Sequence, residues 1–158
     1  MEELQVTSIA IGIVVSFVFS EVYGLAAGGV VVPGYIALFL HRPTALALTL
    51  VVALGTFALT KVIGSVVIVY GRRRTSLCIL IGFALGAWAE RADLLLRDGG
   101  YGDADLTVIG YIIPGLIAIW FDRQGVTNTL ATLTIAACVV RLALLLLVGP
   151  LMLAELPR

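Results

Sequence analysis

The stretch GVVVPGYIALFLHR at residues 29–42 recurs in altered form as GYIIPGLIAIWFDR at residues 110–123. Both stretches are apolar, both contain a Pro-Gly pair, and both end in an arginine. At one fixed offset the identical residues are Gly29 and Gly110, Pro33 and Pro114, Gly34 and Gly115, Ile36 and Ile117, Ala37 and Ala118, and Arg42 and Arg123. Short hydrophobic segments interrupted by glycine and proline at matching positions of two halves point to a functional site in a membrane protein. We therefore predict a duplicated membrane unit.

The composition supports a protein that is solvated by lipid. Of the 158 residues, 61% are hydrophobic and only 13% are charged. A soluble domain of this composition would expose one continuous apolar surface. The formal net charge is zero, which gives no indication of nucleic-acid binding. Cys78 and Cys138 are single residues in apolar runs, and we expect both to be small buried hydrophobes.

The hydrophobic pattern predicts the helices. Long apolar runs cover residues 4–20, 44–70, 76–89 and 128–153, and a helix needs roughly 20 apolar residues to span a membrane. The Pro-Gly segments at 25–40 and 106–121 lie between these runs, and proline and glycine predict a broken or kinked helix in each. The predicted fold is an all-α integral membrane protein with two repeats, 1–71 and 76–158, joined by a basic loop at 72–75. Each repeat has two long helices flanking a short Pro-Gly-broken helix.

The arginines at 72–74 provide the strongest topology signal. Because cytoplasmic loops are rich in Arg and Lys, we expect this loop in the cytoplasm and the net acidic stretch at 90–105 outside. Two topologies satisfy both expectations. In the first, the Pro-Gly segments cross the membrane, which gives two inverted three-helix halves and an external N-terminus. In the second, they are re-entrant, which gives four spans and a cytoplasmic N-terminus.

Charged residues within the apolar runs favour the six-span topology. Lys61 and Arg141 each cost roughly 2.5–3.5 kcal/mol on an insertion scale if they are unpaired at the centre of a helix. Glu21 and Glu90, which close the first and third runs, are the predicted partners of Lys61 and Arg141 respectively. Six crossings bring each pair to a similar depth, whereas four crossings place Glu21 and Lys61 at opposite faces. The four residues form either two structural ion pairs or a polar lining for a substrate path.

The repeated segments carry the candidate contacts to a substrate or polymer. Arg42 and Arg123 are suited to bidentate recognition of carboxylates, although an arginine at a helix end also snorkels to lipid headgroups. Small residues in the same segments also allow close helix packing. Arg72, Arg73 and Arg74 are interpreted as a topology signal or as a docking site for a partner. The full set of candidate contacts is Pro33, Gly34, Arg42, Pro114, Gly115 and Arg123.

The sequence contains no recognisable set of catalytic residues. It has no phosphate-binding glycine loop, no zinc-protease motif and no Ser-His-Asp combination placed by spacing. Its single histidine, His41, has no orienting partner indicated by the sequence, and we interpret it as a membrane-surface residue. We therefore predict no catalytic residue, no metal site and no cofactor. The pattern does not indicate an enzyme that acts alone.

The chain resembles the CapC/PgsC family of membrane proteins from bacterial poly-γ-glutamate (capsule) biosynthesis. The resemblance covers nearly the whole chain but departs in the polar stretch at 90–105. It rests on SEVYG at 20–24, GVVVPGY at 29–35, Pro43, Lys61, YGRR at 70–73, IPGLIA at 113–118 and QG at 124–125.

This resemblance implies a multi-pass protein of the bacterial plasma membrane. It implies a non-catalytic subunit that works with a separate ATP-dependent glutamate ligase and with other capsule-synthesis or export subunits. The family supplies no established catalytic residues. The expected role is to anchor and support the ligase and to form part of the polymer exit path. A self-sufficient small transporter for an anionic solute is the alternative, and a membrane-embedded transferase is the weakest candidate.

Overall fold

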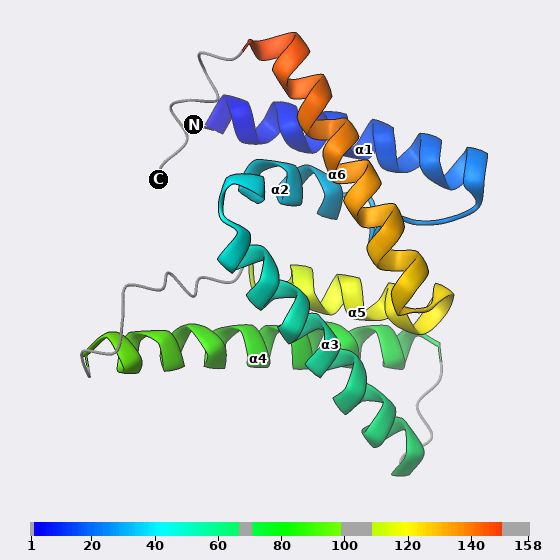
Figure 1. Cartoon of the computed structure of the whole chain (residues 1–158). Helices are drawn as coiled ribbons and strands as arrows, with labels where there is room; N and C mark the ends of the chain where they lie inside the picture. Colours follow the sequence, from blue (N-terminus) through cyan, green and yellow to red (C-terminus); the bar gives the residue numbers. More distant parts are fainter. Residues whose placement is uncertain (1, 67–70, 99–108, 150–158) are drawn as a thin grey trace. The chain divides into compact units, whose positions relative to one another are not determined.

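The computed structural model describes residues 2–66, 71–98 and 109–149, and within these ranges the regular structure is helical throughout. This confirms the predicted all-α class. Figure 1 shows the helices in chain order. They are α1 (Glu2–Tyr23), α2 (Val32–Leu38), the 3₁₀ turn η1 (Phe39–His41), α3 (Pro43–Val66), α4 (Arg72–Asp98), α5 (Ile113–Gln124) and α6 (Val126–Val148).

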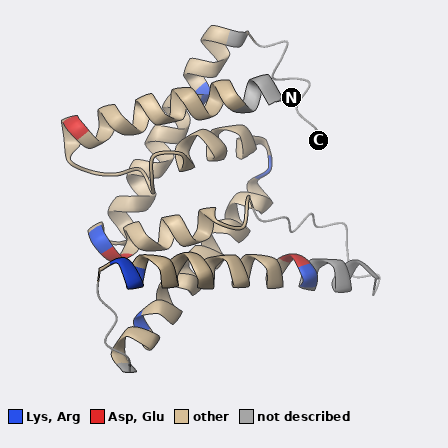
Figure 2. Ribbon diagram, turned by 180° about the vertical axis from the view of Figure 1, so that it is seen from behind, with Lys and Arg blue, Asp and Glu red and all other residues tan. Residues whose placement is uncertain are grey.

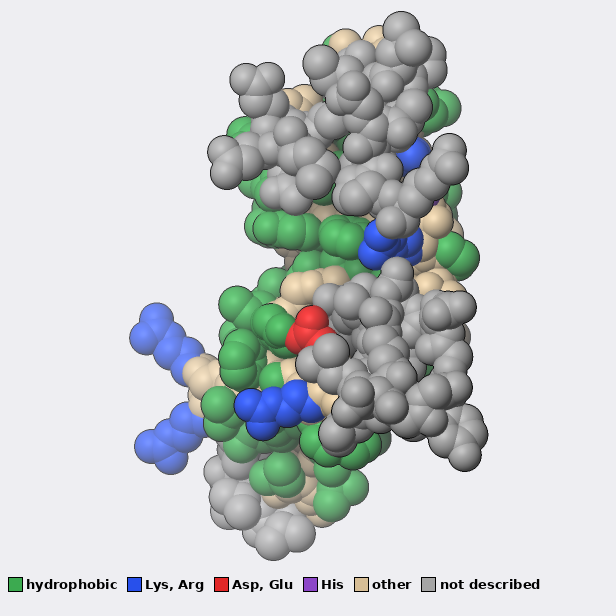
Figure 3. Space-filling view, turned by 90° about the vertical axis from the view of Figure 1, so that its left-hand side faces the viewer, with side chains coloured by type: hydrophobic (Ala, Val, Ile, Leu, Met, Phe, Trp, Pro, Cys, Tyr) green, Lys and Arg blue, Asp and Glu red, His purple; other side chains and the backbone are tan. Residues whose placement is uncertain are grey.

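Three of the described helices are long and apolar enough to cross a membrane. The spans are Val6–Tyr23 in α1, Pro43–Ser65 in α3 and Val126–Leu147 in α6. Large hydrophobic side chains point outward along these helices, while most buried polar groups are serine and threonine hydroxyls. The described surface on the face in Figure 3 is accordingly mainly hydrophobic. This distribution suits a protein surrounded by lipid.

The chain folds into two compact units. Unit 1 comprises Met1–Leu40 and Val126–Arg158, and its helices α1, α2 and α6 pack against one another. Unit 2 comprises His41–Gly125, where α3, α4 and α5 pack together. The predicted repeats divide the chain elsewhere, between residues 71 and 76. The last long helix of each predicted repeat therefore packs against the first two helices of the other.

Each of the two Pro-Gly segments contains a short helix that begins one residue before the proline. Pro33 and Pro114 lie in the first turns of α2 and α5, where a missing backbone N–H breaks no helical hydrogen bond. The expected break therefore precedes the proline, and glycines with positive φ, Gly29 and Gly110, stand in front of it. With 7 and 12 residues, α2 and α5 extend over about 10 and 18 Å. Neither covers a hydrocarbon core of about 30 Å alone.

The predicted basic loop at 72–75 is helical. The chain turns at Gly71, whose φ is +61°, and α4 begins at Arg72. The backbone N–H groups of Arg74 and Thr75 donate to the carbonyl oxygen of Gly71 at 3.2 and 3.4 Å. The positive φ at a residue without a Cβ lets the helix start directly after the turn. The cytoplasmic location of these arginines stays a prediction, and residues 99–108 of the predicted external region lie outside the described ranges.

Each short helix packs backbone to backbone against a long one. In unit 1, a Cβ added at Gly12 of α1 would lie 2.7 Å from the Cα and N atoms of Gly34 in α2. In unit 2, a Cβ added at Gly82 of α4 would lie 2.6 Å from the Cα and N atoms of Gly115 in α5. Only glycine permits this approach, and both short helices are held by the same kind of contact.

Candidate functional site

In unit 1, the backbone around the Pro-Gly pair is hydrogen-bonded by hydroxyl groups of both long helices. The Ser8 hydroxyl donates to the Gly34 carbonyl at 2.8 Å, and the Ser16 hydroxyl donates to the Gly29 carbonyl at 3.3 Å. From α6, the Thr132 hydroxyl donates to the Ala26 carbonyl, also at 3.3 Å. The bonds to Gly29 and Ala26 satisfy carbonyls of the non-helical backbone before α2. Pro33 and Gly34 are buried, so they face neighbouring helices.

In unit 2, the equivalent segment is held in a similar way. The backbone N–H of Ile109 donates to the Thr49 hydroxyl of α3 at 3.0 Å, and Pro114 and Gly115 are buried. The carbonyl oxygen of Cys78 lies beneath Gly115, 2.9 Å from the position of an added Cβ. Cys78 is buried, as predicted, whereas Cys138 is exposed on α6. The expectation for Cys138 was wrong because α6 turns this apolar side chain outward.

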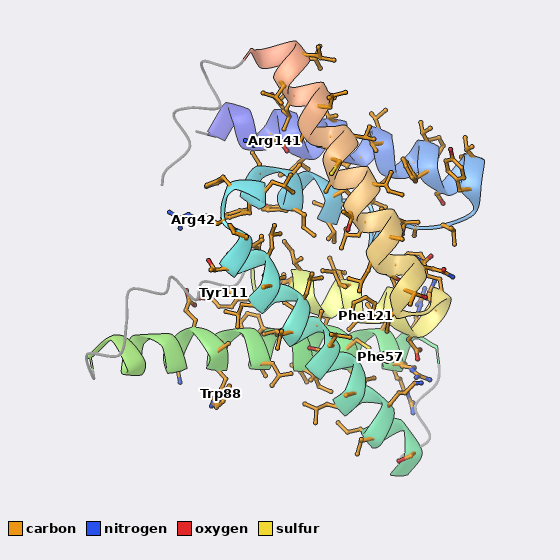
Figure 4. The ribbon with its side chains drawn as sticks, viewed as in Figure 1. Arg42, Phe57, Trp88, Tyr111, Phe121 and Arg141 are labelled. Atoms are coloured by element: carbon orange, nitrogen blue, oxygen red, sulfur yellow. The ribbon has the colours of Figure 1, made fainter. Side chains whose placement is uncertain are left out.

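The structure places Arg42 and Arg123 at opposite ends of the α3–α5 pair. Arg42 is half-buried directly before α3, and Arg123 is exposed in the last turn of α5. Near its start α3 bonds to Ile109, and further on its Phe57 ring lies 6.1 Å from the Phe121 ring of α5. The chain from Arg42 to Phe57 extends over about 22 Å at 1.5 Å per residue. Figure 4 shows Arg42 far from Phe121, which lies two residues before Arg123. The two arginines therefore do not form one shared site.

Three of the charged residues predicted within the membrane have partners in their own unit. The Lys61 ammonium lies 4.9 Å from the Phe57 ring centroid, a cation–π distance. Glu90 accepts a hydrogen bond from the Tyr111 hydroxyl. Arg141 donates through Nη1 to the Ala37 carbonyl at 3.3 Å. Glu21 and Arg141 belong to unit 1, while Lys61 and Glu90 belong to unit 2, so the predicted ion pairs stay predictions.

The Arg141 contact leads to a stability prediction. Arg141 reaches a carbonyl near the end of α2, where cations are favourable and helical partners are missing. Replacing it with leucine leaves that carbonyl without the donor, which costs about 1–3 kcal/mol in a buried setting. We expect Arg141→Leu to lower the thermal unfolding midpoint of the purified protein in detergent. Leu142→Ala, at a side chain that is 61% exposed, should be nearly silent. Equal midpoints for wild type and Arg141→Leu would contradict the prediction.

An ion pair that the sequence reasoning missed joins α4 to α5. Nη2 of Arg74 lies 2.6 Å from Oδ1 of Asp122, and the two side chains are 32% and 24% exposed. In the sequence, Arg74 is one arginine of a triplet, and Asp122 lies 48 positions further along the chain. The sequence held one signal for this ion pair. Asp122 is an acid, whereas the matching position of the first stretch is His41. His41 itself is exposed.

Basic side chains gather around this ion pair. Arg123 lies beside Asp122, with its guanidinium carbon 5.4 Å from the Trp120 ring centroid. In Figure 2 the blue stretches of α3, α5 and the start of α4 lie towards one end of unit 2, with one red stretch among them, and a further blue stretch of α4 lies beside a red one towards its other end. Asp122 is the only acid among the described residues there. We call this region the basic end, and it consists of Lys61, Arg72, Arg73, Arg74, Asp122 and Arg123.

Apolar outward faces, buried hydroxyls and three helices long enough to span a membrane are consistent with an α-helical membrane protein. The chain matches the family described as Capsule biosynthesis CapC over residues 11–130, and it belongs to that family. It is 33% identical over 123 residues to the PGA biosynthesis protein CapC of Bacillus subtilis (strain 168), covering 77% of this chain and 80% of that protein. It is 31% identical over 131 residues to the Capsule biosynthesis protein CapC of Bacillus anthracis, covering 79% and 83%. No solved structure matches the chain.

Proposed function

We propose that this chain is a membrane subunit of a poly-γ-glutamate synthase complex in the bacterial plasma membrane. In this role it anchors and supports the ATP-dependent glutamate ligase subunit and forms part of the polymer exit path. The observation that carries the proposal is the family match over residues 11–130, together with the two relatives named for capsule or PGA biosynthesis. The three apolar helices support the membrane location.

The proposed architecture is two inverted repeats with six crossings. The short helices α2 and α5 need the non-helical residues before each proline to complete a crossing. Non-helical backbone is tolerated at membrane depth when it is buried in protein. The Ser16 and Thr132 hydroxyls donate to this backbone and the Thr49 hydroxyl accepts from it, and these hydrogen bonds support such a role. Re-entrant segments with four crossings are the alternative.

Arg42 and Arg123 are proposed to contact carboxylates at two separate points of the path. Each guanidinium presents a planar fork of donors that matches a carboxylate. Their location at opposite ends of the α3–α5 pair supports sequential contacts with a long polyanion. Pro33, Gly34, Pro114 and Gly115 then position the short helices by packing, because these residues are buried.

Reconstitution with the ligase tests the proposed function. We expect the ligase to co-purify with this protein from detergent and to form polymer from glutamate and ATP when both proteins are present. Either protein alone should give little polymer. Full activity of the ligase alone would overturn the proposal. Uptake of an anionic solute by vesicles containing only this chain, with no ligase binding, would favour the transporter instead.

A further inference from the structure

We propose that the basic end of unit 2 is a docking surface for an acidic patch on a soluble protein partner. Arg72 and Arg73 supply the charges that contact the partner, and Arg74 is a positioning residue. The inference rests on the proposed function only in the choice of the partner tested, which is the ligase.

The contacts within unit 2 assemble this surface from three helices. The Arg74–Asp122 ion pair at 2.6 Å holds the start of α4 against the end of α5. Phe57 of α3 packs its ring against Phe121, one residue before Asp122. Lys61 follows Phe57 by one turn and lies over its ring. Residues far apart in the sequence are thereby brought to one end of the unit.

Arg72 and Arg73 are available to a partner, whereas Arg74 is engaged inside the unit. The first two side chains are exposed and the third is half-buried. All three lie in the first turn of α4, where positive charge is unfavourable with respect to the helix dipole. Local stability therefore does not account for Arg72 and Arg73. A topology signal would explain positive charge near the membrane. It would not explain why Arg74 forms an ion pair with Asp122 of α5.

The location of the surface favours a soluble protein over lipid. Leu80, Phe83 and Trp88 are exposed along α4. The apolar surface that suits lipid therefore lies along the middle of this helix. Arg72 and Arg73 are exposed in the first turn of α4, before these apolar side chains. Only one acid, Asp122, is present among the described residues at this end, and it is already paired. The surface is therefore complementary to a negatively charged partner.

The test compares charge reversals at the two ends of α4. The purified protein in detergent is titrated with the soluble ligase, for wild type, Arg72→Glu/Arg73→Glu and Arg91→Glu. Arg91 is an exposed arginine near the other end of the same helix, and it is the matched control. We expect the double variant to weaken binding about tenfold or more and the control to leave it unchanged. Wild-type binding should also weaken as the salt concentration rises.

A second variant tests whether the positive charge carries the binding. Arg72→Lys/Arg73→Lys retains the positive charge, so we expect it to keep most of the binding that the glutamate variant loses. Unchanged binding of the glutamate variant overturns the docking surface while leaving the proposed function intact. Failure of the wild-type protein to bind the ligase removes the proposed function itself. Binding to vesicles that contain phosphatidylglycerol is measured alongside binding to the ligase. If the glutamate variant binds the ligase normally and loses only its binding to these vesicles, the surface recognises lipid and the inference is wrong.

Discussion

Alanine at Gly82 or Gly115 is expected to unfold unit 2 or to separate its short helix from α4. A Cβ at Gly82 would lie 2.6 Å from backbone atoms of Gly115, and one at Gly115 would lie 2.9 Å from the Cys78 carbonyl oxygen. Backbone atoms cannot move aside as a flexible side chain can. Overpacking typically costs 1–3 kcal/mol and sometimes more, and we expect the effect here to reach about 3 kcal/mol. The measurement is the thermal unfolding midpoint and the fraction of monodisperse protein in detergent.

Gly64→Ala is the matched control for this prediction. Gly64 lies within α3, and a Cβ added there would meet no atom within 4 Å. Alanine has the higher helix propensity, so this variant should be as stable as wild type or slightly more stable. Gly12→Ala and Gly34→Ala should be as damaging in unit 1, where the corresponding distances are 2.7 Å. Wild-type stability of Gly82→Ala would contradict the close backbone contact.

Loss of the Arg74–Asp122 ion pair is expected to have the second largest effect. The two side chains are 32% and 24% exposed, between the fully exposed and fully buried cases. Exposed pairs contribute about 0–1 kcal/mol, whereas breaking a buried pair costs about 3–5 kcal/mol. We therefore expect Arg74→Gln or Asp122→Asn alone to destabilise the protein by about 1–3 kcal/mol. A shift of the unfolding midpoint in detergent measures this loss.

The double variant Arg74→Gln/Asp122→Asn tests whether the two losses arise from one interaction. Each single variant leaves a partner charge without its counter-ion, and the double variant removes both charges. Its loss should therefore be smaller than the sum of the single losses. Arg72→Gln, an exposed neighbour in the same turn, should have little effect on stability. Strictly additive losses at positions 74 and 122 would mean that the pair contributes no coupling.

The predicted all-α fold class followed from local rules, whereas the burial of the Pro-Gly pairs did not. Apolar runs of membrane length predict helices directly, and α1, α3 and α6 follow the runs that begin near residues 4, 44 and 128. The prediction that proline breaks or kinks a helix in each Pro-Gly segment was incomplete. Pro33 and Pro114 start helices instead of interrupting them, because the first turn of a helix has no use for the missing N–H. The arginines at 72–74 likewise begin α4, since Gly71 makes the turn before them.

The site was less predictable, because it depends on pairings between distant residues. Arg42 and Arg123 occupy matching sequence positions, yet they lie at opposite ends of the α3–α5 pair. Arg74 and Asp122 are 48 positions apart, and no spacing rule joins them. The glycines at 12 and 82 gave no signal by themselves. Their importance appears only when the facing glycines, Gly34 and Gly115, are known.

The sequence by itself determined that this protein is helical, apolar and built around two similar Pro-Gly segments. Those properties depend on local propensity and hydropathy, which act within a few residues of the chain. The tertiary structure alone decided that α3 packs with α4 and α5, and that α6 packs with α1 and α2. Helix partners are selected by close packing of small residues and by hydrogen bonds between side-chain hydroxyls and the backbone of another segment. Hydropathy does not indicate which small or hydroxyl-bearing residues face each other. Only the folded chain therefore reveals that the last long helix of each predicted repeat packs with the first two helices of the other.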